Sequence, residues 1–470
     1  MREQMRGKIV DFWQRAPALY YSLYLLLAIL FTLSTPWALL FTLLLFWGRT
    51  VRQALIALAL FLATLYYLQH HFYFPPTHSQ GSFRFHITDV TSPKKSFQKG
   101  ISYKGNIREV VNREGKRERC CLPTYLYVRQ PLDLDHDYWV EGMLHAKNKG
   151  SYFIRSLDSP KIDKKRVTLC KIREQSKRWL KHYIHTHYKG TLTAPFLIAL
   201  TTGKNDDPLL KGHLTQIGCA HLLAISGFHF GLIAAFCHFL LKPFFHYKIH
   251  TFLVIGLLLT YLLFIGKSPS IYRAFIFATC FLMAPIFERR SSSINTLGVA
   301  LGICLILDPI MAIDVGFQLS FLATGAIIAL YPKIRESITC KNDKGIMLFF
   351  MNGVALNVAV NVALIPLTIL YFHSINLHSM FYNLFFPSLT ALSLLLFLSA
   401  GCLHPLMPPL AKVLHLSNNF ITENFLWIAE RRPLYEKTLF LEGPPGWLIT
   451  LLFIVLYGVA LNASIKRKSL

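Results

Sequence analysis

The stretch CAHLLAISGFHFGLIAAFCH, residues 219–238, decides the fold of this chain. It is apolar enough to be read as a membrane-crossing segment. Five polar or small residues interrupt it, namely His221, Ser226, Gly227, His229 and Gly231. Because hydrocarbon offers polar side chains no hydrogen-bond partners, polar residues inside a span indicate a pathway or an active site. The alternative is that small and hydroxyl residues are ordinary contacts between packed helices.

Composition puts the whole chain in the membrane class. Of its 470 residues, 53% are hydrophobic and 37 are Phe. Such a content is typical of an integral membrane protein and argues against a soluble globular one. The formal net charge of +25 is large for so apolar a chain. A basic excess of this size has three explanations: contact with anionic lipid headgroups, positively charged cytoplasmic loops, or binding of a polyanionic partner such as nucleic acid.

Hydropathy predicts three spans in an N-terminal domain, residues 1–72. They cover residues 18–34, 36–48 and 51–69. The middle span is short for a hydrocarbon core of about 30 Å. The first eight residues are basic, and Arg49 and Arg52 flank the turn before the third span. Since cytoplasmic loops carry the positive charge, we expect the N-terminus inside and the residues after the third span outside.

Eight more spans are predicted in a C-terminal domain, residues 193–470. They cover residues 219–241, 251–266, 270–287, 293–307, 313–331, 346–371, 379–403 and 445–463. Residues 405–431 either cross the membrane or lie at its surface, and the side of the C-terminus depends on which is true. The expected fold is a polytopic α-helical membrane protein with about 10–12 spans.

Between the two helical blocks, residues 73–168 are polar and show the period-two alternation of β-strands. The alternating runs are residues 83–87, 124–128, 138–144 and 152–154. Gly, Pro and Asn separate these runs. The pattern predicts a small all-β domain, an antiparallel barrel or curled sheet, inserted between spans. The span count puts this domain on the external, periplasmic side.

Residues 81–189 hold about half of the net charge, with 24 Lys and Arg against 11 Asp and Glu. One interpretation is an ordinary solvated basic face. The other is capture of a DNA backbone, which needs charge but no particular sequence. The candidate capture residues are Arg84, Lys104, Arg108, Arg117, Arg119, Lys147, Lys149, Lys177 and Arg178. Tyr residues interleave with these cations, either as a stacking surface for bases or as barrel core.

A basic amphipathic helix is expected over residues 169–192, at the membrane surface. Its His185-Thr186-His187 triplet suggests a metal site. However, residues 188–190 lack the Asp and His that complete the HxHxDH pattern of binuclear metallohydrolases. We therefore expect no metal and no other cofactor.

The nine cysteines are scattered without CxxC spacing, so the sequence holds no zinc or redox motif. Three of them belong to the external part, where disulfides persist. A bridge between Cys170 and either Cys120 or Cys121 is one possibility. The other six are expected to be small apolar residues within the membrane.

Several stretches of the C-terminal domain together resemble the ComEC family of competence proteins. GCAHLLAISGFHFGLI, residues 218–233, resembles the family signature. Four more stretches follow the family pattern: ALTTGKNDD (199–207), GKSPSIYRAFIF (266–277), LDPIMAIDVGFQLSFLATGAI (307–327) and NVALIPLTILYFHSINLHSMFYNLFFPSL (361–389). The resemblance implies a competence-type channel that passes one DNA strand into the cytoplasm while the other is degraded. It also implies that the β-rich segment is an OB-like external domain.

The resemblance also implies partners. Many family members carry a C-terminal metallo-β-lactamase-like nuclease domain, whereas this sequence stops at Leu470. We therefore expect no nuclease activity here and a separately encoded nuclease. The sequence holds no P-loop, which favours a cytoplasmic ATP-driven DNA motor as the energy source. A periplasmic DNA-binding protein is a further expected partner, and a dimer is one possible oligomeric state.

Polar residues within the spans are the candidate lining of the DNA path. They are His221, Ser226, Gly227, His229, Gly231, Arg273, Gln318, Ser320, Asn357, Asn361 and Asn383. If residues 219–241 form one helix, His221 and His229 lie about 80° apart around its axis. Alternatively, Ser226-Gly227 interrupts the helix, as happens where membrane backbone lines a cavity.

Arg273 is the most costly of these residues, because an unpaired guanidinium inside a span is strongly unfavourable. It either contacts phosphate or pairs with Asp308 or Asp314, the two acidic residues of a nearby loop. The first arrangement makes it part of a DNA path, and the second makes it structural.

The sequence thus predicts a bacterial inner-membrane channel that translocates single-stranded DNA during natural transformation and is not an enzyme. Two alternatives stay open. Ser226 with His221 or His229 as base would make an intramembrane hydrolase, although no orienting carboxylate lies nearby in the sequence. A non-conducting envelope receptor, in which the β-domain binds polyanion and the helices only anchor it, fits the same composition.

Overall fold

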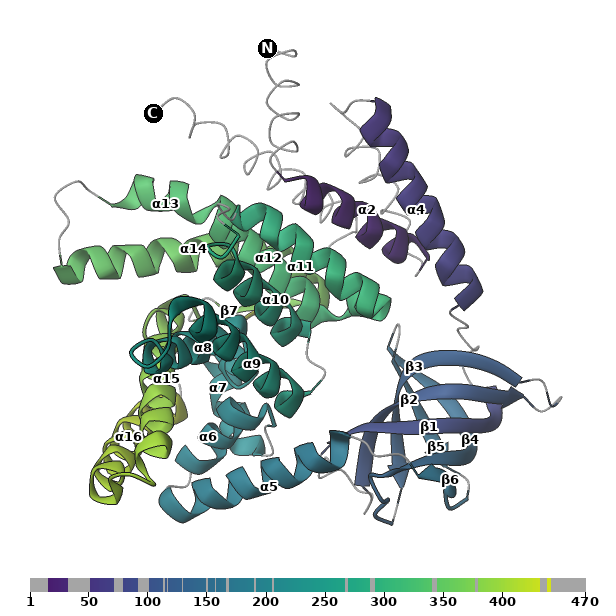
Figure 1. Ribbon diagram of the computed structural model, residues 1–470, viewed down its shortest axis with the longest axis horizontal. Coiled ribbons are helices and arrows are strands. Elements are labelled where there is room, and N and C mark those ends of the chain that lie inside the picture. The colour runs from purple at the N-terminus through teal and green to yellow at the C-terminus, as the bar shows by residue number, and fades with distance from the viewer. Residues whose placement is uncertain are drawn as a thin grey trace.

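The computed structural model describes residues 16–32, 51–71, 79–91, 101–112, 115, 117–128, 130–148, 151–156, 158–165, 169–189, 192–204, 207–266, 269–287, 292–339, 345–376, 379–431 and 438–440. Figure 1 shows a body of packed helices and, at lower right, a β-barrel beside one end of α5 (Leu169–His187). The predicted combination of apolar helices with an inserted all-β part is confirmed. The predicted spans 36–48 and 445–463 lie outside the described residues.

Thirteen further described helices lie before and after the barrel and α5. They are α2 (Pro17–Thr32), α4 (Val51–His71), α6 (Thr193–Thr202), α7 (Pro208–Gln216), α8 (Gly227–Leu241), α9 (Tyr247–Ile265), α10 (Pro269–Met283), α11 (Ser293–Leu307), α12 (Val315–Ala329), α13 (Tyr331–Ile338), α14 (Gly345–Phe372), α15 (Ser379–Leu403) and α16 (Pro408–Glu430). A short antiparallel ribbon joins β7 (Ser374–Asn376) to β8 (Thr438–Phe440). Most bounds agree with the predicted spans to within a few residues.

Three of the described helices, α9, α14 and α15, are long and apolar enough to cross a membrane. A fourth span results if α12 and α13, which meet at a bend of 48°, count as one. Six further helices have shorter apolar segments of 10–17 residues, and they include α2, α4, α8, α10 and α11. The membrane-protein character is therefore supported, and the number of 10–12 spans stays a prediction.

Residues 219–241, predicted as one span, do not form one helix. Residues Ala220–Leu222 form a 3₁₀ turn, η1, and α8 begins only at Gly227. Between them, Ser226 has extended backbone with φ −101° and ψ 168°. His221 and His229 therefore lie on different elements, and the 80° separation on a continuous helix is wrong. The alternative prediction, a break at Ser226-Gly227, is confirmed.

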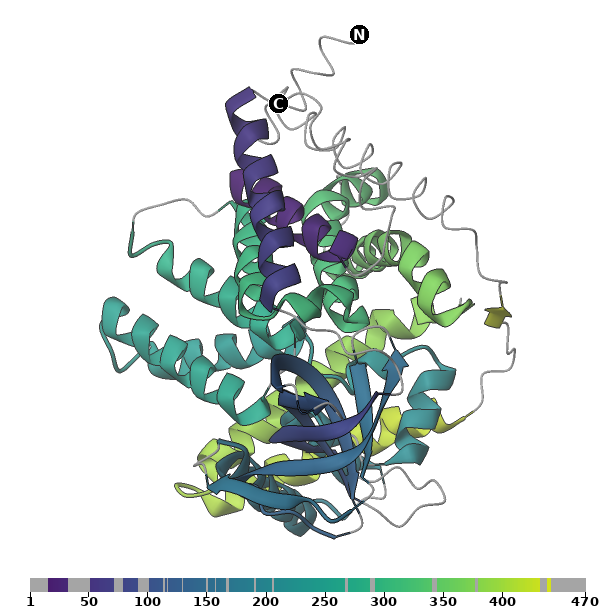
Figure 2. The same ribbon diagram turned by 90° about the vertical axis from the view of Figure 1, so that its right-hand side faces the viewer.

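The all-β part is a closed barrel (Figure 2). Its strands are β1 (Ser79–Thr91), β2 (Ile101–Asn112), β3 (Arg117–Val128), β4 (His136–Asn148), β5 (Ser151–Ser156) and β6 (Lys161–Lys165). The order is β1-β2-β3-β5-β4, and a β4–β1 pairing closes the ring. All pairings are antiparallel except β3–β5, which the antiparallel prediction missed. A five-stranded barrel with this crossing connection fits the OB-like fold.

The barrel core follows the predicted alternation. Phe83, Phe85 and Ile87 on β1 are buried, as period-two residues of a closed barrel must be. Gly105 on β2 permits this packing, because a Cβ there would lie 2.2 Å from the His86 carbonyl oxygen. Of the tyrosines proposed either for stacking or for the core, three are buried in the barrel: Tyr103, Tyr138 and Tyr152.

The predicted disulfide does not form. Cys170 is a free thiol, and Cys170 and Cys120 are both buried within the barrel core. The side chain of Cys121 lies outside the described residues, but Cys170 is unbridged in any case. Burial raises the pKa of the Cys170 thiol to about 11, so it stays protonated and behaves as a small apolar residue.

Helices α2 and α11 approach unusually closely. A Cβ on Gly298 of α11 would lie 2.0 Å from the backbone nitrogen of Leu19 on α2. The Ser22 hydroxyl donates to the Gly298 carbonyl at 2.8 Å, and the Ala18 N–H donates to Asn295 at 3.0 Å. A glycine is required at residue 298 because the two backbones touch there, as small residues allow in membrane helices.

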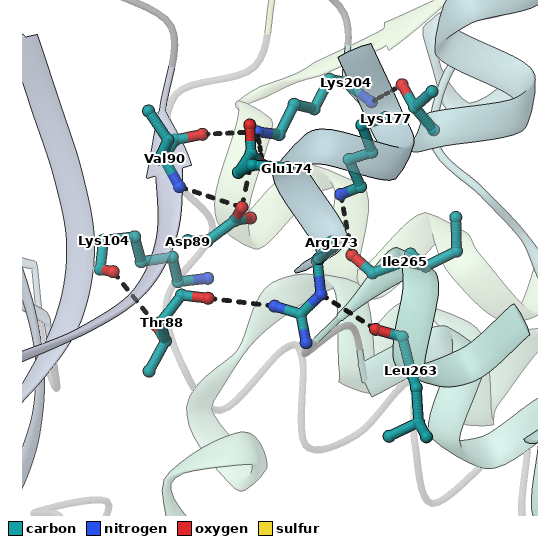
Figure 3. Close-up of polar contacts among 11 residues, drawn as sticks. Thr88, Asp89, Val90, Lys104, Arg173, Glu174, Lys177, Lys204, Leu263 and Ile265 are labelled. Carbon is teal, nitrogen blue, oxygen red and sulfur yellow. Dashed lines mark hydrogen bonds and ion pairs between the residues drawn. The ribbon is translucent and has the colours of Figure 1, made fainter. Parts of the chain in front are cut away.

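Polar contacts fix the barrel to the helical body through α5, the predicted basic helix (Figure 3). Arg173 Nη1 donates to the Thr88 carbonyl of β1 at 3.0 Å, and its Nε donates to the Leu263 carbonyl of α9 at 2.9 Å. Lys204, which follows α6, donates to the Val90 carbonyl of β1 at 2.8 Å. Each of these two cations therefore joins barrel backbone to a helical element.

Acidic residues balance Lys204 at this junction. Its Nζ lies 2.5 Å from Glu174 of α5 and 3.5 Å from Asp89 of β1. The Lys204 and Glu174 side chains are only 14% and 11% exposed. At this depth, removal of either side chain leaves the other charge buried without a partner, which is strongly destabilising.

The C-terminal end of α9 explains why cations gather here. The last carbonyls of a helix have no intrahelical partner, and cations near a helix C-terminus are favourable. Arg173 donates to the Leu263 carbonyl, and Lys177 Nζ donates to the Ile265 carbonyl at 3.0 Å. Gly266 ends the helix with φ +98°, and a Cβ there would lie 2.9 Å from Arg173 Nη1. Helix α5 is thus docked by two cations one turn apart.

Replacement of Lys204 by Met tests this docking. The Val90 carbonyl loses its donor and Glu174 loses its cation, so we expect a loss of about 1–3 kcal/mol in unfolding free energy. Thermal unfolding of the purified protein in detergent should show a lower Tm. Lys211→Met, which removes an exposed lysine of α7, is the matched control and should leave the Tm unchanged. Equal Tm values for both variants would contradict the docking role.

Candidate functional site

The first turn of α8 is built on Ser226 and His229. The Ser226 N–H donates to His229 Nδ1 at 3.2 Å, and the Ser226 hydroxyl lies 3.2 Å from the same nitrogen. Both contacts join the residue before the helix to the third residue of the helix, which is the pairing of a capping box. His229 is fully buried, and its Nε2 has no hydrogen-bond partner among the described residues.

Arg273 of α10 is held by neutral groups. Its Nε donates to the Ser320 hydroxyl at 3.0 Å, and its Nη1 donates to the Thr324 hydroxyl. Both partners lie on α12, one turn apart. The guanidinium also lies 5.9 Å from the centre of the Phe321 ring, which provides a modest cation–π attraction. Only 8% of Arg273 is exposed.

The two acidic residues considered as partners of Arg273 have other roles. Asp308 accepts the Ile310 N–H at 3.3 Å, and Asp314 accepts the Phe317 N–H at 2.8 Å. They cap the 3₁₀ turn Pro309–Ile313 and α12, respectively. Within the described part of the chain, Arg273 forms no ion pair. The structural alternative, pairing with Asp308 or Asp314, is therefore not observed.

Gly227 makes room for this arginine. A Cβ on Gly227 would lie 2.5 Å from Arg273 Nη2, so the guanidinium touches the first residue of α8. A helix N-terminus carries partial positive charge, and Arg273 adds a full charge beside it. A buried cation without a counter-ion is unfavourable, so the arrangement can accept an anionic group.

The amide residues predicted to line the path all form hydrogen bonds within the protein. Gln318 Nε2 donates to the Ala312 carbonyl at 2.8 Å, and its Oε1 accepts from the Tyr371 hydroxyl of α14 at 2.8 Å. Asn383 Oδ1 accepts from the Cys219 thiol at 3.3 Å. Two further amides, on α14, also bond to backbone: Asn357 donates to the Met380 carbonyl, and Asn361 donates to the Asn357 carbonyl at 2.9 Å.

Two other predicted residues are exposed. His221 lies in η1, outside α8, and Gly231 lies in the second turn of α8. Among the described residues, a Cβ on Gly231 would meet no atom within 4 Å, so this glycine makes no close contact with them. Thr324 was missed by sequence reasoning. Its signal was the i, i+4 spacing of two hydroxyls, Ser320 and Thr324, within an apolar helix.

Two of the predicted capture cations have structural roles. Arg84 forms ion pairs with Glu109 at 3.0 Å and Asp163 at 2.7 Å. Lys177 is 2% exposed and bonds to Ile265, and burial lowers its pKa to about 8. Neither side chain is a free surface cation, so these two assignments are corrected.

The other predicted capture residues differ in exposure. Arg117 of the barrel and Arg178 of α5 are exposed, whereas Lys104 and Arg108 are partly buried. The remaining three have side chains outside the described residues: Arg119, Lys147 and Lys149. Direct DNA capture therefore remains a prediction, and Arg117 and Arg178 are its best-exposed candidates.

The part of the chain that contains this site is similar to known proteins. A family model described as "Competence protein" matches residues 202–465, more than half of the chain. ComE operon protein 3 of Bacillus subtilis is 25% identical over 147 residues, which are 30% of this chain and 19% of that protein. Recombination protein 2 of Haemophilus influenzae is 30% identical over 160 residues, which are 32% of this chain and 20% of that protein.

An uncharacterized protein of Mycoplasma pneumoniae is 26% identical over 288 residues, 60% of this chain and 70% of that protein. For the two relatives with assigned names, by contrast, the similarity spans only about a fifth of their length. No solved structure matches the chain. Gly227, His229 and Arg273 all lie within the residues that the family model matches.

A pair of glycine variants on α8 tests the contact with Arg273. Gly227→Ala forces the buried guanidinium away from its two hydroxyls, and we expect a loss of about 1–3 kcal/mol, as for overpacking of a core. Gly231→Ala meets open space and should be neutral or stabilising by about 0.4–1 kcal/mol. Thermal unfolding of both purified variants checks this. A Gly227→Ala protein as stable as Gly231→Ala would disprove the contact.

Proposed function

Because the chain belongs to the competence protein family, we propose that it carries single-stranded DNA across the bacterial inner membrane during natural transformation. In this proposal the helical body conducts the strand and the OB-like barrel receives it on the periplasmic side. A cytoplasmic ATP-driven motor pulls the strand, and a separate periplasmic protein delivers the DNA. The names of the matched relatives, a ComE operon protein and a recombination protein, are consistent with handling of DNA.

The observation that carries the proposal is the buried positive charge of Arg273. Its described partners are two hydroxyls, a ring and the N-terminal turn of α8. Rings of Arg and Lys are how anion and phosphate pores select their ions. A phosphate of the DNA backbone supplies the counter-charge that none of the described residues provides at this place.

Neutral partners also suit transport. A pore must bind its ion weakly enough to release it. A phosphate that leaves Arg273 is replaced by the hydroxyls of Ser320 and Thr324, so the guanidinium never loses all its hydrogen bonds. Since Arg273 is 8% exposed, a strand reaches it only when α8, α10 and α12 move apart. The proposal therefore requires an open state of the helical body.

The barrel supports the capture step. OB-like barrels bind oligonucleotides on one face and its adjoining loops, and electrostatic attraction to phosphates needs only exposed cations. Arg117 on β3 and Arg178 on α5 are exposed in this way. Tyr127 is 45% exposed and offers a stacking surface for a base.

The hydrolase alternative has one contact in its favour, the 3.2 Å approach of the Ser226 hydroxyl to His229 Nδ1. The same nitrogen also accepts the Ser226 N–H, so it is already engaged as a cap. A catalytic base also needs a group that orients its second nitrogen, and His229 Nε2 has none among the described residues. The contact is better explained as the start of α8.

Delivery across a membrane separates a channel from a binding-only receptor. Purified protein in proteoliposomes is offered labelled single-stranded DNA together with an inward driving force, and the DNA protected from external nuclease is measured. A channel gives protected full-length strand, and a receptor gives bound strand that the nuclease removes. Ser226→Ala should transport normally, because the hydroxyl caps a helix and performs no chemistry.

Arg273→Gln should reduce transformation without loss of protein from the membrane. Glutamine keeps a hydrogen-bonding group but removes the charge, so we expect a fall of roughly 10- to 100-fold, the effect of losing one hydrogen bond to a charged group. Transformants are counted at equal membrane abundance. Arg335→Gln removes an exposed arginine of α13 and should have no effect. Normal transformation by Arg273→Gln would refute the path.

Arg117→Gln combined with Arg178→Gln should weaken binding of single-stranded DNA to the full-length protein in detergent. Because each phosphate contact of a single strand contributes about 0.7 to the slope of log K against log salt, the magnitude of the slope should fall by about 1.4. Lys248→Gln, which removes an exposed lysine at the start of α9, should leave affinity and slope unchanged. An unchanged slope in the double variant would exclude these residues from capture.

A further inference from the structure

Three histidines from distant parts of the sequence meet at the end of α5 opposite to the barrel (Figure 1). His187 is the last residue of α5, His404 follows α15, and His415 lies on α16. One nitrogen from each lies within 4.8 Å of the other two. The ring centres of His187 and His415 are 4.5 Å apart, and those of His187 and His404 are 5.2 Å apart. This cluster is separate from the site around Arg273.

Neighbouring groups orient two of these rings. His187 Nδ1 lies 2.9 Å from the Tyr183 carbonyl oxygen, to which it donates, and this leaves Nε2 as the ligand atom. His415 Nδ1 lies 2.7 Å from the Tyr188 hydroxyl, which Asn418 holds at 3.1 Å. Metal-binding histidines are oriented in the same way, through a hydrogen bond from the nitrogen that does not bind the metal.

The three proposed ligands differ in exposure. His415 is buried, and His187 is partly buried. His404 is exposed, so an ion can reach the cluster from its surface.

We propose that His187, His404 and His415 form a binding site for a divalent transition-metal ion of the Zn²⁺ type. Imidazole nitrogens are preferred ligands of Zn²⁺, at about 2.0–2.1 Å in tetrahedral sites. That geometry sets the nitrogens about 3.3 Å apart. The exposed His404 side chain can close the difference from 4.8 Å by rotation.

The fourth position of this site is open. The Tyr183 hydroxyl lies 3.0 Å from His415 Nε2 and releases this nitrogen when an ion binds, and then either this hydroxyl or a water molecule completes the tetrahedron. The bound ion ties the end of α5 to α15 and α16. Since Arg173 holds the opposite end of α5 against the barrel and α9, the metal site fixes the second end of the same helix.

Titration of the purified full-length protein with Co²⁺ tests the site. The protein carries a tag without histidine and is first stripped of metal with a chelator. We expect binding of one ion per chain, the visible absorption of tetrahedral Co²⁺, and displacement by Zn²⁺. Zn²⁺ should also raise the Tm, because it binds only the folded chain.

Two ligand variants and one matched control make the result specific. His404→Ala removes the exposed ligand and leaves the packed core intact, and His187→Ala removes the α5 ligand. Both should lose the Co²⁺ spectrum and the Tm increase. His185→Ala removes an exposed histidine two residues before His187 and should behave as the unaltered protein.

Two results would overturn the proposal. If the unaltered protein binds no Co²⁺, the three rings form only a hydrogen-bonded cluster with Tyr183 and Tyr188. If His404→Ala and His187→Ala bind Co²⁺ as tightly as His185→Ala, the ion lies on histidines elsewhere.

Discussion

The unpaired carbonyl groups at the C-terminal end of α9 are the constraint on which the arrangement of this protein depends. They need donors, and α5 supplies them from Arg173 and Lys177, which lie on one face because they are one turn apart. Arg173 reaches β1 with its remaining donors, so the same side chain that completes α9 also positions the barrel. The glycine at residue 266 is needed for this contact. Hydrogen bonds to backbone carbonyls therefore help to set the orientation of the barrel.

Positive charge is accommodated in two different ways in this molecule. At the junction, Lys204 is matched by Glu174 and Asp89, and the charges are balanced within the protein. At Arg273, the described partners are hydroxyls, and the charge is left unbalanced. The first arrangement is what a fixed joint requires. The second is costly for a structural role but suited to a transient anionic ligand, and this contrast makes Arg273 the more informative residue for function.

Local features of the sequence predicted local features of the structure. Period-two alternation identified strands of the barrel, and apolar runs identified α11, α14 and α15 to within one residue at each end. The partners of Arg273 were harder to predict. Pairing with the nearby Asp308 or Asp314 was as plausible as contact with phosphate, because their use as caps of a turn and a helix is seen only in the structure. The histidine cluster could not be predicted, since His187 and His415 are brought together only by the packing of α5 on α16. A pattern search finds residues close in sequence, and it misses sites assembled by tertiary structure.

The close approach of Gly298 to Leu19 has a consequence for biosynthesis. Ser22 and its partner carbonyl are 276 residues apart, and a ribosome adds about 5–20 residues per second. Helix α2 therefore emerges roughly 15–55 s before α11 exists to receive it. During this interval the serine hydroxyl and the small surface around it lack their final neighbour. The nascent chain must either keep α2 shielded by another helix or by the insertion machinery, or delay its final packing until more than half of the protein has been made.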